Sequence, residues 1–312
     1  MVEPRATGHE VVGRPDGDLA LALDVGGTKL AVGLVTEKGR IVRRAEVPTA
    51  GTDDGEALFV RLSELVQQVR VGVGATTVVC GVGCGGPMSS GAQAAGHTVS
   101  PLNIAAWRHF PLRARLAEAV GLPTFVDNDA KALALGEGRF GAAIGVTDYL
   151  AMVVSTGVGA GIVLDGHLLE GRSGNAGHVG HLIVEPGGRE CRCGARGCLE
   201  AEASGTAIAA ITGRPAAEAP FAMVERAGRL VGRAVGSVAN LLDLRLALVA
   251  GSVALGYGEP FFAAANAELG RCARLEFSAG AVIRRGGLGA DGPLVGAAAV
   301  GWRGLRRPAG NP

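Results

Sequence analysis

Apolar residues along this chain gather in short runs separated by glycine-rich breaks, and the spacing within each run predicts an element. The first three β-rich runs are Leu19–Val25, Leu30–Val35 and Arg40–Val47, with turns at 26–27 and 37–39. A helix is predicted over 56–69, where Leu58, Leu62, Leu65 and Val69 recur at helical spacing. Strands at 77–82 and 123–126 and a helix at 112–120 follow, and Asp127-Asn128-Asp129 opens a further helix to about residue 138.

The second half of the chain begins as the first half does. The pattern predicts a strand at 150–155, a glycine-rich turn at 156–161, a strand at 162–164, a turn at 165–166 and a strand at 167–169. Asp24 then falls opposite Ser155, and Gly26 opposite Gly157. Beyond this unit, helices are expected at 201–211, 217–241, 260–274 and 294–305, with a strand at 246–249. Two similar units predict a duplicated α/β architecture with a ligand between two lobes.

The bulk composition fits two lobes and narrows the class of protein. A chain of 312 residues is long for a single core. Hydrophobic residues make up 48% of the chain, yet no apolar run reaches the roughly 18 residues that a membrane-spanning helix needs. The net charge of +1 gives no reason to expect nucleic acid or an anionic membrane as a partner.

No signal peptide is apparent, and residues 1–18 are predicted to be a disordered tail. A cytoplasmic location is therefore expected. Cysteines in that compartment are thiols or metal ligands more often than disulfides.

Two glycine turns are candidates for phosphate binding. In the first, Asp24-Val-Gly-Gly-Thr-Lys29, successive N–H groups can face an anion, and Gly26 and Gly27 permit its close approach. Thr28 adds a hydroxyl donor and Lys29 a positive charge, while Asp24 could hold Mg²⁺ through water.

The second turn spans Ser155 to Gly161 and includes Thr156, Gly157 and Gly159. It could grip the same triphosphate from the other side. Ordinary polar hairpins are the alternative for both turns, since neither turn matches the P-loop or the dinucleotide-binding fingerprint.

A further constellation has the composition of a metal site. His181 is followed by Cys191, Cys193 and Cys198. Three thiolates and one imidazole form the ligand set of a closed, tetrahedral, structural Zn²⁺ site, which leaves no coordination position for chemistry. Free cysteines in a mobile loop are the alternative.

Together these motifs resemble the ROK family of repressors and sugar kinases. The resemblance runs from about Leu19 to Leu305 and rests on Asp24–Lys29, Asp127–Ala130, Ser155–Gly161, Gly180–His181 and the Cys-Arg-Cys-Gly-Ala-Arg-Gly-Cys-Leu-Glu run at 191–200. It implies a two-lobed, actin-like (ribonuclease H-like) α/β ATPase fold with mixed sheets, with ATP between the lobes and sugar at the base of the cleft. The lobes would be 19–126, completed by the helix at about 295–312, and 127–294 with the zinc loop. A homodimer or homotetramer is implied by the resemblance alone.

The resemblance also implies roles for individual residues. Asp129 matches the family's catalytic base, and a carboxylate there could accept the proton of the attacking hydroxyl; an N-cap role is the alternative. Residues that match sugar contacts are Asn103, Asn128, His181 and Glu200, with His181 facing zinc through one ring nitrogen and sugar through the other. Gly251-Ser252 matches the adenosine-binding turn, although the usual glycine pair is here Ala250–Gly251.

One departure from the family pattern concerns the substrate. Sugar kinases of the family usually have Gly-Glu-x-Gly-His, whereas this chain has Gly177-His178-Val-Gly-His181. Neutral imidazole offers one donor and one acceptor, but a carboxylate only accepts. A modified hexose, an amino sugar or a cyclitol is therefore one hypothesis. Glucose is the other, because losing one hydrogen bond costs only about 0.5–1.5 kcal/mol.

We therefore expect an ATP- and Mg²⁺-dependent, glucokinase-like kinase of a hexose or related polyol. A sugar-responsive repressor would need a helix-turn-helix domain before the core, where only residues 1–18 stand. A non-catalytic sugar-binding protein is the other alternative, and sequence alone leaves it open.

Overall fold

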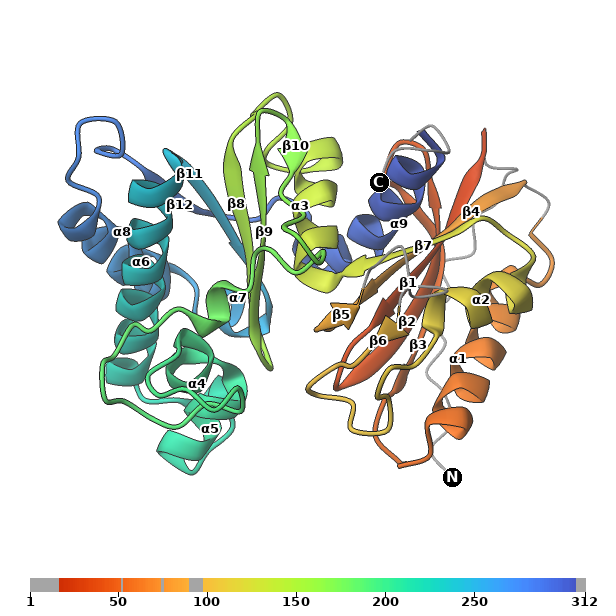
Figure 1. Cartoon of the computed structure of the whole chain (residues 1–312), viewed down its shortest axis with the longest axis horizontal. Helices are drawn as coiled ribbons and strands as arrows, with labels where there is room; N and C mark the ends of the chain where they lie inside the picture. Colours follow the sequence, from red (N-terminus) through yellow and green to blue (C-terminus); the bar gives the residue numbers. More distant parts are fainter. Residues whose placement is uncertain (1–16, 52, 74–75, 90–97, 307–312) are drawn as a thin grey trace. The chain divides into compact units, whose positions relative to one another are not determined.

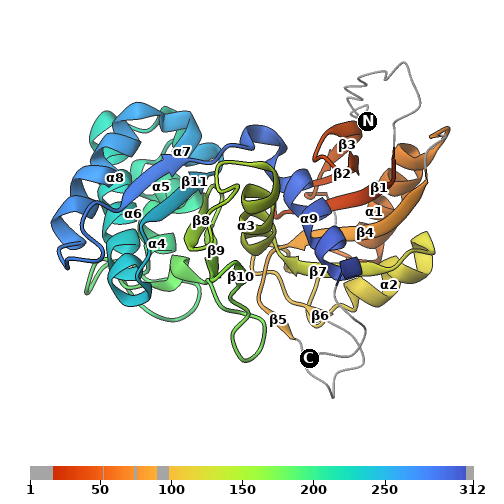
Figure 2. The same ribbon diagram turned by 90° about the horizontal axis from the view of Figure 1, so that it is seen from above.

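The computed structural model describes residues 17–51, 53–73, 76–89 and 98–306. The chain divides into two compact units (Figures 1 and 2). The first unit comprises the chain up to Phe140, the segment Glu170–Ala176 and the chain from Ala290 onwards. The second unit comprises Gly141–Leu169 and Gly177–Gly289. The chain therefore passes between the units several times.

The first unit is a five-stranded mixed sheet with helices on both faces. Its elements are β1 (Leu19–Val25), β2 (Lys29–Thr36), β3 (Ile41–Pro48), α1 (Gly55–Arg70), β4 (Thr77–Cys84), β5 (Met88–Ser89), β6 (Thr98–Val99), α2 (Leu112–Val120), β7 (Thr124–Asn128), α3 (Asp129–Phe140) and α9 (Gly292–Arg306). The strand order is β3-β2-β1-β4-β7. Strands β1 to β3 are antiparallel, while β4 and β7 run parallel to β1.

The alternation of side chains along β1 explains the two layers of helices. Leu19, Leu21 and Leu23 join a core that includes the apolar face of α1. Ala20 and Ala22 face the opposite side and pack with α9. Because side chains alternate along a strand, the small alanines let α9 approach the sheet closely.

The second unit has the same sheet plan. Its elements are β8 (Tyr149–Val154), β9 (Val158–Leu164), β10 (His167–Leu168), η1 (Val179–His181), α4 (Leu199–Ala203), α5 (Gly205–Thr212), η2 (Ala216–Glu218), α6 (Phe221–Leu242), β11 (Leu246–Ala250), α7 (Ser252–Tyr257), α8 (Glu259–Cys272) and β12 (Val282–Arg285), and a 3₁₀ turn, η3 (Gly289–Asp291), leads back to α9. The strand order is β10-β9-β8-β11-β12, again three antiparallel strands followed by two parallel ones. The shared order is the structural signature of the duplication that the sequence suggested.

Several predicted boundaries are wrong, for local reasons. The strand expected from residue 162 begins at Val158, because Gly159 and Gly161 pair with β8 rather than turn. The helix expected over 201–211 breaks at Ser204, which is extended and accepts a hydrogen bond from the N–H of Ala207 as an N-cap. Residues 217–218 belong to a 3₁₀ turn, and α6 starts only at Phe221.

The pattern gave no indication of the short strands β5 and β6, of α7 or of β12. The expected lobe boundary after residue 126 falls inside β7, which is hydrogen-bonded to β4 of the first unit. Apart from residues 17 and 18, the tail expected over 1–18 lies outside the described residues. Over the described ranges, no helix has the length and apolar content to cross a bilayer.

Candidate functional site

In the first unit, sheet register brings the expected acidic residues to one edge. Asp24 of β1 lies opposite Gly83 of β4, which lies opposite Asp127 of β7. The next row joins Val25, Cys84 and Asn128. Since these three strands are parallel, their carboxyl ends meet at the same edge, and Asp129 follows directly as the first residue of α3.

The electrostatics of this edge show that Asp24 and Asp129 influence each other. Burial, together with the negative charge of Asp129, raises the pKa of Asp24 from 3.8 to about 7, against the opposing effect of Lys29. Burial also raises the pKa of the Cys84 thiol well above its usual value, and both carboxylates contribute. Neighbouring, partly buried carboxylates suit a cation or a proton acceptor.

The first glycine turn closes beside this edge. The N–H of Gly26 donates to the carbonyl of Lys29 at 3.0 Å, and the Thr49 hydroxyl donates to the carbonyl of Gly26 at 2.6 Å. A Cβ on Gly27 would lie 2.5 Å from the Cβ of Asn103, so only glycine lets Asn103 stand against the turn. Thr49 was not predicted, because a lone threonine at a strand end carries no motif.

The Lys29 ammonium and the Thr28 carbonyl already have partners within the protein. The Lys29 ammonium lies 2.8 Å from a carboxylate oxygen of Glu46, and both side chains are about half exposed. This hydrogen bond lowers the pKa of Glu46. The carbonyl of Thr28 accepts from the N–H of Thr49. Any anion at this turn would therefore share the Lys29 charge with Glu46.

Asn128 is the residue that caps α3. Its side-chain oxygen accepts from the N–H groups of Ala130 and Lys131, at 3.0 and 3.4 Å. Asp129 also accepts from Ala130, at 2.8 Å through one oxygen. Because Asn128 supplies the cap, Asp129 is not required as the N-cap of this helix.

In the second unit, the other glycine turn is held by two helix starts. The N–H of Ser155 donates to the carbonyl of Gly157 at 2.9 Å, and the hydroxyls of Ser155 and Ser252 lie 2.9 Å apart. The N–H of Gly205 donates to the carbonyl of Ser155, and the Thr206 hydroxyl donates to the carbonyl of Thr156. Gly205 and Thr206 were missed, although Ser204-Gly205-Thr206 is a recognisable helix start.

The expected adenosine turn is next to this glycine turn. Gly251 has φ +100°, and a Cβ there would collide with the backbone of Val154. Gly251-Ser252 therefore lies against the end of β8, where Ser252 meets Ser155. The two turns that the sequence placed about 95 residues apart form one polar corner of the second unit.

The expected sugar contacts of the second unit gather at the start of β9. A carboxylate oxygen of Glu200, in α4, accepts from the N–H of Val158 at 3.0 Å. Gly180 packs so closely on the Val158 carbonyl that a side chain would not fit. His178 precedes the 3₁₀ turn η1 and His181 ends it. The centroids of their rings are 6.1 Å apart.

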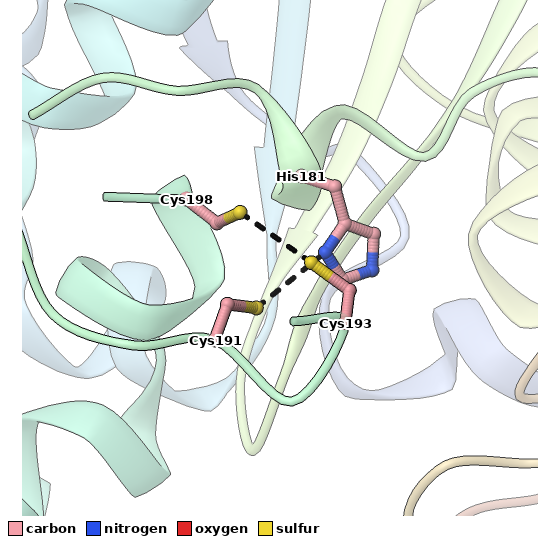
Figure 3. Close-up of side chains that lie close together, drawn as sticks. All are labelled: His181, Cys191, Cys193 and Cys198. Carbon is pink, nitrogen blue, oxygen red and sulfur yellow. Dashed lines mark hydrogen bonds between the residues drawn. The ribbon is translucent and has the colours of Figure 1, made fainter. Parts of the chain in front are cut away.

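His181, Cys191, Cys193 and Cys198 turn towards a common centre (Figure 3). Their candidate ligand atoms all lie within 4.8 Å of one another. The Nδ1 of His181 is 3.6 Å from the Cys191 sulfur, and the sulfurs of Cys193 and Cys198 are 3.7 Å apart. A tetrahedral Zn²⁺ with Zn–S near 2.3 Å and Zn–N near 2.0 Å would separate its ligands by about 3.5–3.8 Å.

The donor set and its spacing therefore fit a zinc ion. Burial raises the pKa of Cys198 to about 12, so a metal that binds this sulfur must displace a proton. Cys80 and Cys84 are fully buried among core residues.

The predicted site residues thus fall into two groups, one in each unit. Those of the first unit are Asp24, Gly26, Gly27, Thr28, Lys29, Asn103, Asn128 and Asp129. Those of the second are Ser155, Thr156, Gly157, Gly159, His178, His181, Glu200, Gly251 and Ser252, with the three cysteine ligands. Within each unit, strand ends and tight turns bring the members together.

Comparison with known proteins gives the class. The chain is 38% identical to an N-acetylmannosamine kinase of Citrobacter koseri over 253 residues, which cover 76% of this chain and 84% of that protein. It is 40% identical to a glucokinase of Thermotoga maritima over 188 residues, 60% of this chain and 58% of that protein. Among solved structures, a ROK family glucokinase of Streptomyces griseus, in complex with glucose and AMPPNP, matches with TM-score 0.77 and 30% identity, covering 91% of this chain and 99% of that chain.

Fold, site and relatives define an ATP-dependent sugar kinase with an actin-like ATPase fold. The chain belongs to the ROK family, whose model matches residues 20–302. The family and fold that the motifs suggested are confirmed.

Proposed function

We propose that this chain transfers the γ-phosphoryl group of ATP to a hydroxyl of an amino sugar, N-acetylmannosamine, with Asp129 as the general base. The observation that carries the kinase chemistry is the carboxyl edge of the first sheet, where Asp129 lies near enough to Asp24 for its charge to raise the pKa of Asp24. An attacking hydroxyl must lose its proton, and a carboxylate held beside the acceptor can take it.

The residues of the two glycine turns have separate tasks in this proposal. Asp24 would hold Mg²⁺ through water, and N–H groups of the turn at Gly26–Lys29 other than that of Gly26, which bonds to the Lys29 carbonyl, would face phosphate oxygens. In the second unit, the Gly157 N–H and the hydroxyl pair of Ser155 and Ser252 would serve phosphate oxygens in the same way, and Gly251 would leave room for the adenosine. ATP with Mg²⁺ would supply the phosphoryl group and neutralise the charge on its oxygens.

The zinc loop would act on the sugar through two residues. His181 would bind Zn²⁺ through Nδ1, the atom that faces Cys191, and turn Nε2 to a sugar hydroxyl. Glu200 stands two residues after the ligand Cys198, and its bond to the N–H of Val158 orients the carboxylate. Asn103 and Asn128 complete the sugar contacts in the first unit. Zinc thus has a structural role that serves substrate binding.

The proposed acetamido substrate rests on His178. An acetamido group presents a carbonyl oxygen, which only accepts hydrogen bonds, beside an N–H, which only donates. The glutamate usual at this position can only accept, so it cannot bond to that carbonyl. A neutral histidine can donate to it. The N-acetylmannosamine kinase relative supports the same substrate, since it aligns with most of this chain.

A substrate panel tests this function. Initial rates of ADP release should be measured with N-acetylmannosamine, N-acetylglucosamine, mannose, glucose and a cyclitol. We expect kcat/KM for N-acetylmannosamine to exceed that for glucose by about tenfold, the worth of one well-placed hydrogen bond. His178→Glu should reduce this ratio by a similar factor.

The control is His167→Glu, which changes an exposed histidine of the second unit that bonds to the carbonyl of Asp165. It should leave the ratio unchanged. A wild-type preference for glucose would favour the glucokinase alternative over the amino sugar. ADP release with none of the sugars would contradict the kinase itself.

A further inference from the structure

A group of charges surrounds the buried Lys131, next to the corner that carries Asn128 and Asp129, and the proposed chemistry does not use it. Its members are Lys131 of α3, Asp127 of β7, Arg303 of α9 and Glu170 of the segment Glu170–Ala176, all in the first unit. We call these four residues the Lys131 cluster. Lys131 is only 1% exposed.

The geometry satisfies the Lys131 ammonium completely. Its Nζ lies 2.5 Å from Glu170 and 3.2 Å from Asp127, and it donates to the carbonyl of Gly174 at 3.0 Å. An ammonium has three donors, so each has a partner. Arg303 closes the ring, at 2.6 Å from Glu170 and 3.6 Å from Asp127.

The cluster pairs two cations with two anions, and the pKa values of both carboxylates are shifted. Lys131 and Arg303 overcome the effect of burial on Glu170 and hold its pKa below its usual value. Burial raises the pKa of Asp127, although Lys131 opposes this. A partly buried network of this kind adds little stability over well-packed apolar residues, but it fixes the groups that it joins.

The cluster joins three parts of the chain that are distant in sequence: the β7–α3 corner, helix α9 and the segment Glu170–Ala176. The segment is also held at its other end. The Asn175 side chain accepts from the N–H of Met88 and donates to its carbonyl, at 3.0 and 2.8 Å. Both chain neighbours of this segment, Leu169 and Gly177, belong to the second unit. The residue after Gly177 is His178.

We propose that Lys131 is a positioning residue for the phosphoryl transfer: it fixes the corner that carries Asn128 and Asp129 and ties to it the segment that leads into His178 and His181. This inference rests on the proposed function, because it assigns a task to the residues of that site. Lys131 touches no reacting atom in this scheme.

The corner shows how the tie would act. Asn128 and Asp129 lie in sequence between Asp127 and Lys131, whose side chains pair with each other. The backbone N–H of Lys131 also donates to the Asn128 side chain. The two proposed site residues are therefore held from both sides. Small displacements of a catalytic group cost much rate, about 100-fold for 1 Å.

The first test is Lys131→Met, which keeps the length of the side chain and removes its charge. We expect kcat with N-acetylmannosamine to fall about 10- to 100-fold, the sugar KM to rise, and the affinity for ATP to stay within about twofold. Lys131→Arg, which keeps the charge, should recover part of kcat. Leu62→Ala, in the buried face of α1, is the control for lost stability and should retain kcat at a similar loss of Tm.

Glu170→Gln tests the same tie while Lys131 stays paired with Asp127. We expect a smaller loss of kcat, and the double variant with Lys131→Met should lose no more than Lys131→Met alone. Equal losses of kcat in Lys131→Met and in Leu62→Ala at matched Tm would overturn the positioning role.

Hydrogen exchange gives a second readout that needs no activity. In Lys131→Met, backbone amides of 170–176 should exchange about tenfold faster, while those of β1 should not. Unchanged exchange over 170–176 would overturn the tie. If the wild type phosphorylated no sugar, the proposed function would fail, and exchange would still decide whether Lys131 holds the segment.

Discussion

The two sheets of this protein share one plan but carry different chemistry. In each, three antiparallel strands are followed by two parallel ones, and a glycine turn joins the central strand to its antiparallel neighbour. At the edge of the first sheet stand carboxylates, Asp24 and Asp129. At the matching turn of the second sheet stand hydroxyls, those of Ser155 and Ser252.

The two copies therefore share a backbone scaffold, while the side chains at the matching turns differ. A backbone turn can serve an anion in either copy, because its N–H groups do not depend on side chains. Charge is needed only where a proton or a cation is handled. Among the residues that the structure describes, the His181 and cysteine loop between β10 and α4 has no counterpart in the first unit.

The largest expected effect comes from a substitution at the carboxylate edge of the first sheet. Asp129→Asn should lower kcat by about 10²–10⁴-fold, because the amide cannot accept the proton of the hydroxyl. Affinity for the sugar, measured by calorimetry, should persist, since the amide has a similar shape.

Two variants control this result. Asp291→Asn alters an exposed aspartate of the first unit that pairs with Arg44, and kcat should not change. Ser155→Ala removes a hydroxyl of the second turn and should cost far less than Asp129→Asn. Similar losses for Asp129→Asn and Ser155→Ala would mean that the chemistry is not divided between the sheets as we propose.

Zinc removal should have the next largest effect, and it should weaken the binding of sugar but not that of nucleotide. Cys198→Ser, or treatment with a zinc chelator, should raise the sugar KM about tenfold or more, because His181 and Glu200 lose their fixed positions. Nucleotide affinity should change less than about twofold. Most residues of the second unit's apolar core lie outside the loop, so the unit should remain folded.

Metal content measured on the purified protein accompanies this test. Cys272→Ser is the matched control, since Cys272 lies in α8 outside the cluster. It should leave zinc content and sugar KM unchanged. A parallel loss of sugar and nucleotide affinity in Cys198→Ser would show that zinc supports the whole unit instead of the sugar contacts.

The His181 and cysteine cluster and the bounds of several elements were predictable because local patterns carry them. The bounds of β1 and α2 match the sequence pattern, and the His181 and cysteine cluster could be inferred from ligand types and spacing alone. Strong periodicity and metal-ligand spacing are local signals, and they do not depend on the rest of the fold.

The rest depends on contacts between distant residues. Glu170 and Arg303 meet Lys131 only because α9 and the 170–176 segment both return to the first unit. Nothing local marks Glu170, and Lys131 was only one of three lysines. The break at Ser204 was missed for the opposite reason: the helical pattern continues through a residue that caps a new helix.

The smallest expected effect is on the free energy of unfolding, and it depends on pH through the ionisation of Asp24. The pKa of Asp24 is about 7 in the folded protein and 3.8 ordinarily. Between these values the folded state binds a proton that the unfolded state lacks, so the contribution of Asp24 to stability is present below pH 3.8 and is lost as pH rises through about 7. Asp24→Asn, which never ionises, should avoid this loss. Without nucleotide and Mg²⁺, its advantage in unfolding free energy over wild type should grow by on the order of 2 kcal/mol between pH 5 and pH 8. Urea titrations at several pH values measure this difference, and Ser155→Ala, at the uncharged turn of the second sheet, should show an offset that does not vary with pH. An Asp24→Asn advantage that stayed constant or shrank with rising pH would mean that Asp24 is ionised in the folded protein at pH 5, and the acidic edge would then lack the desolvation that distinguishes it from the hydroxyl turn.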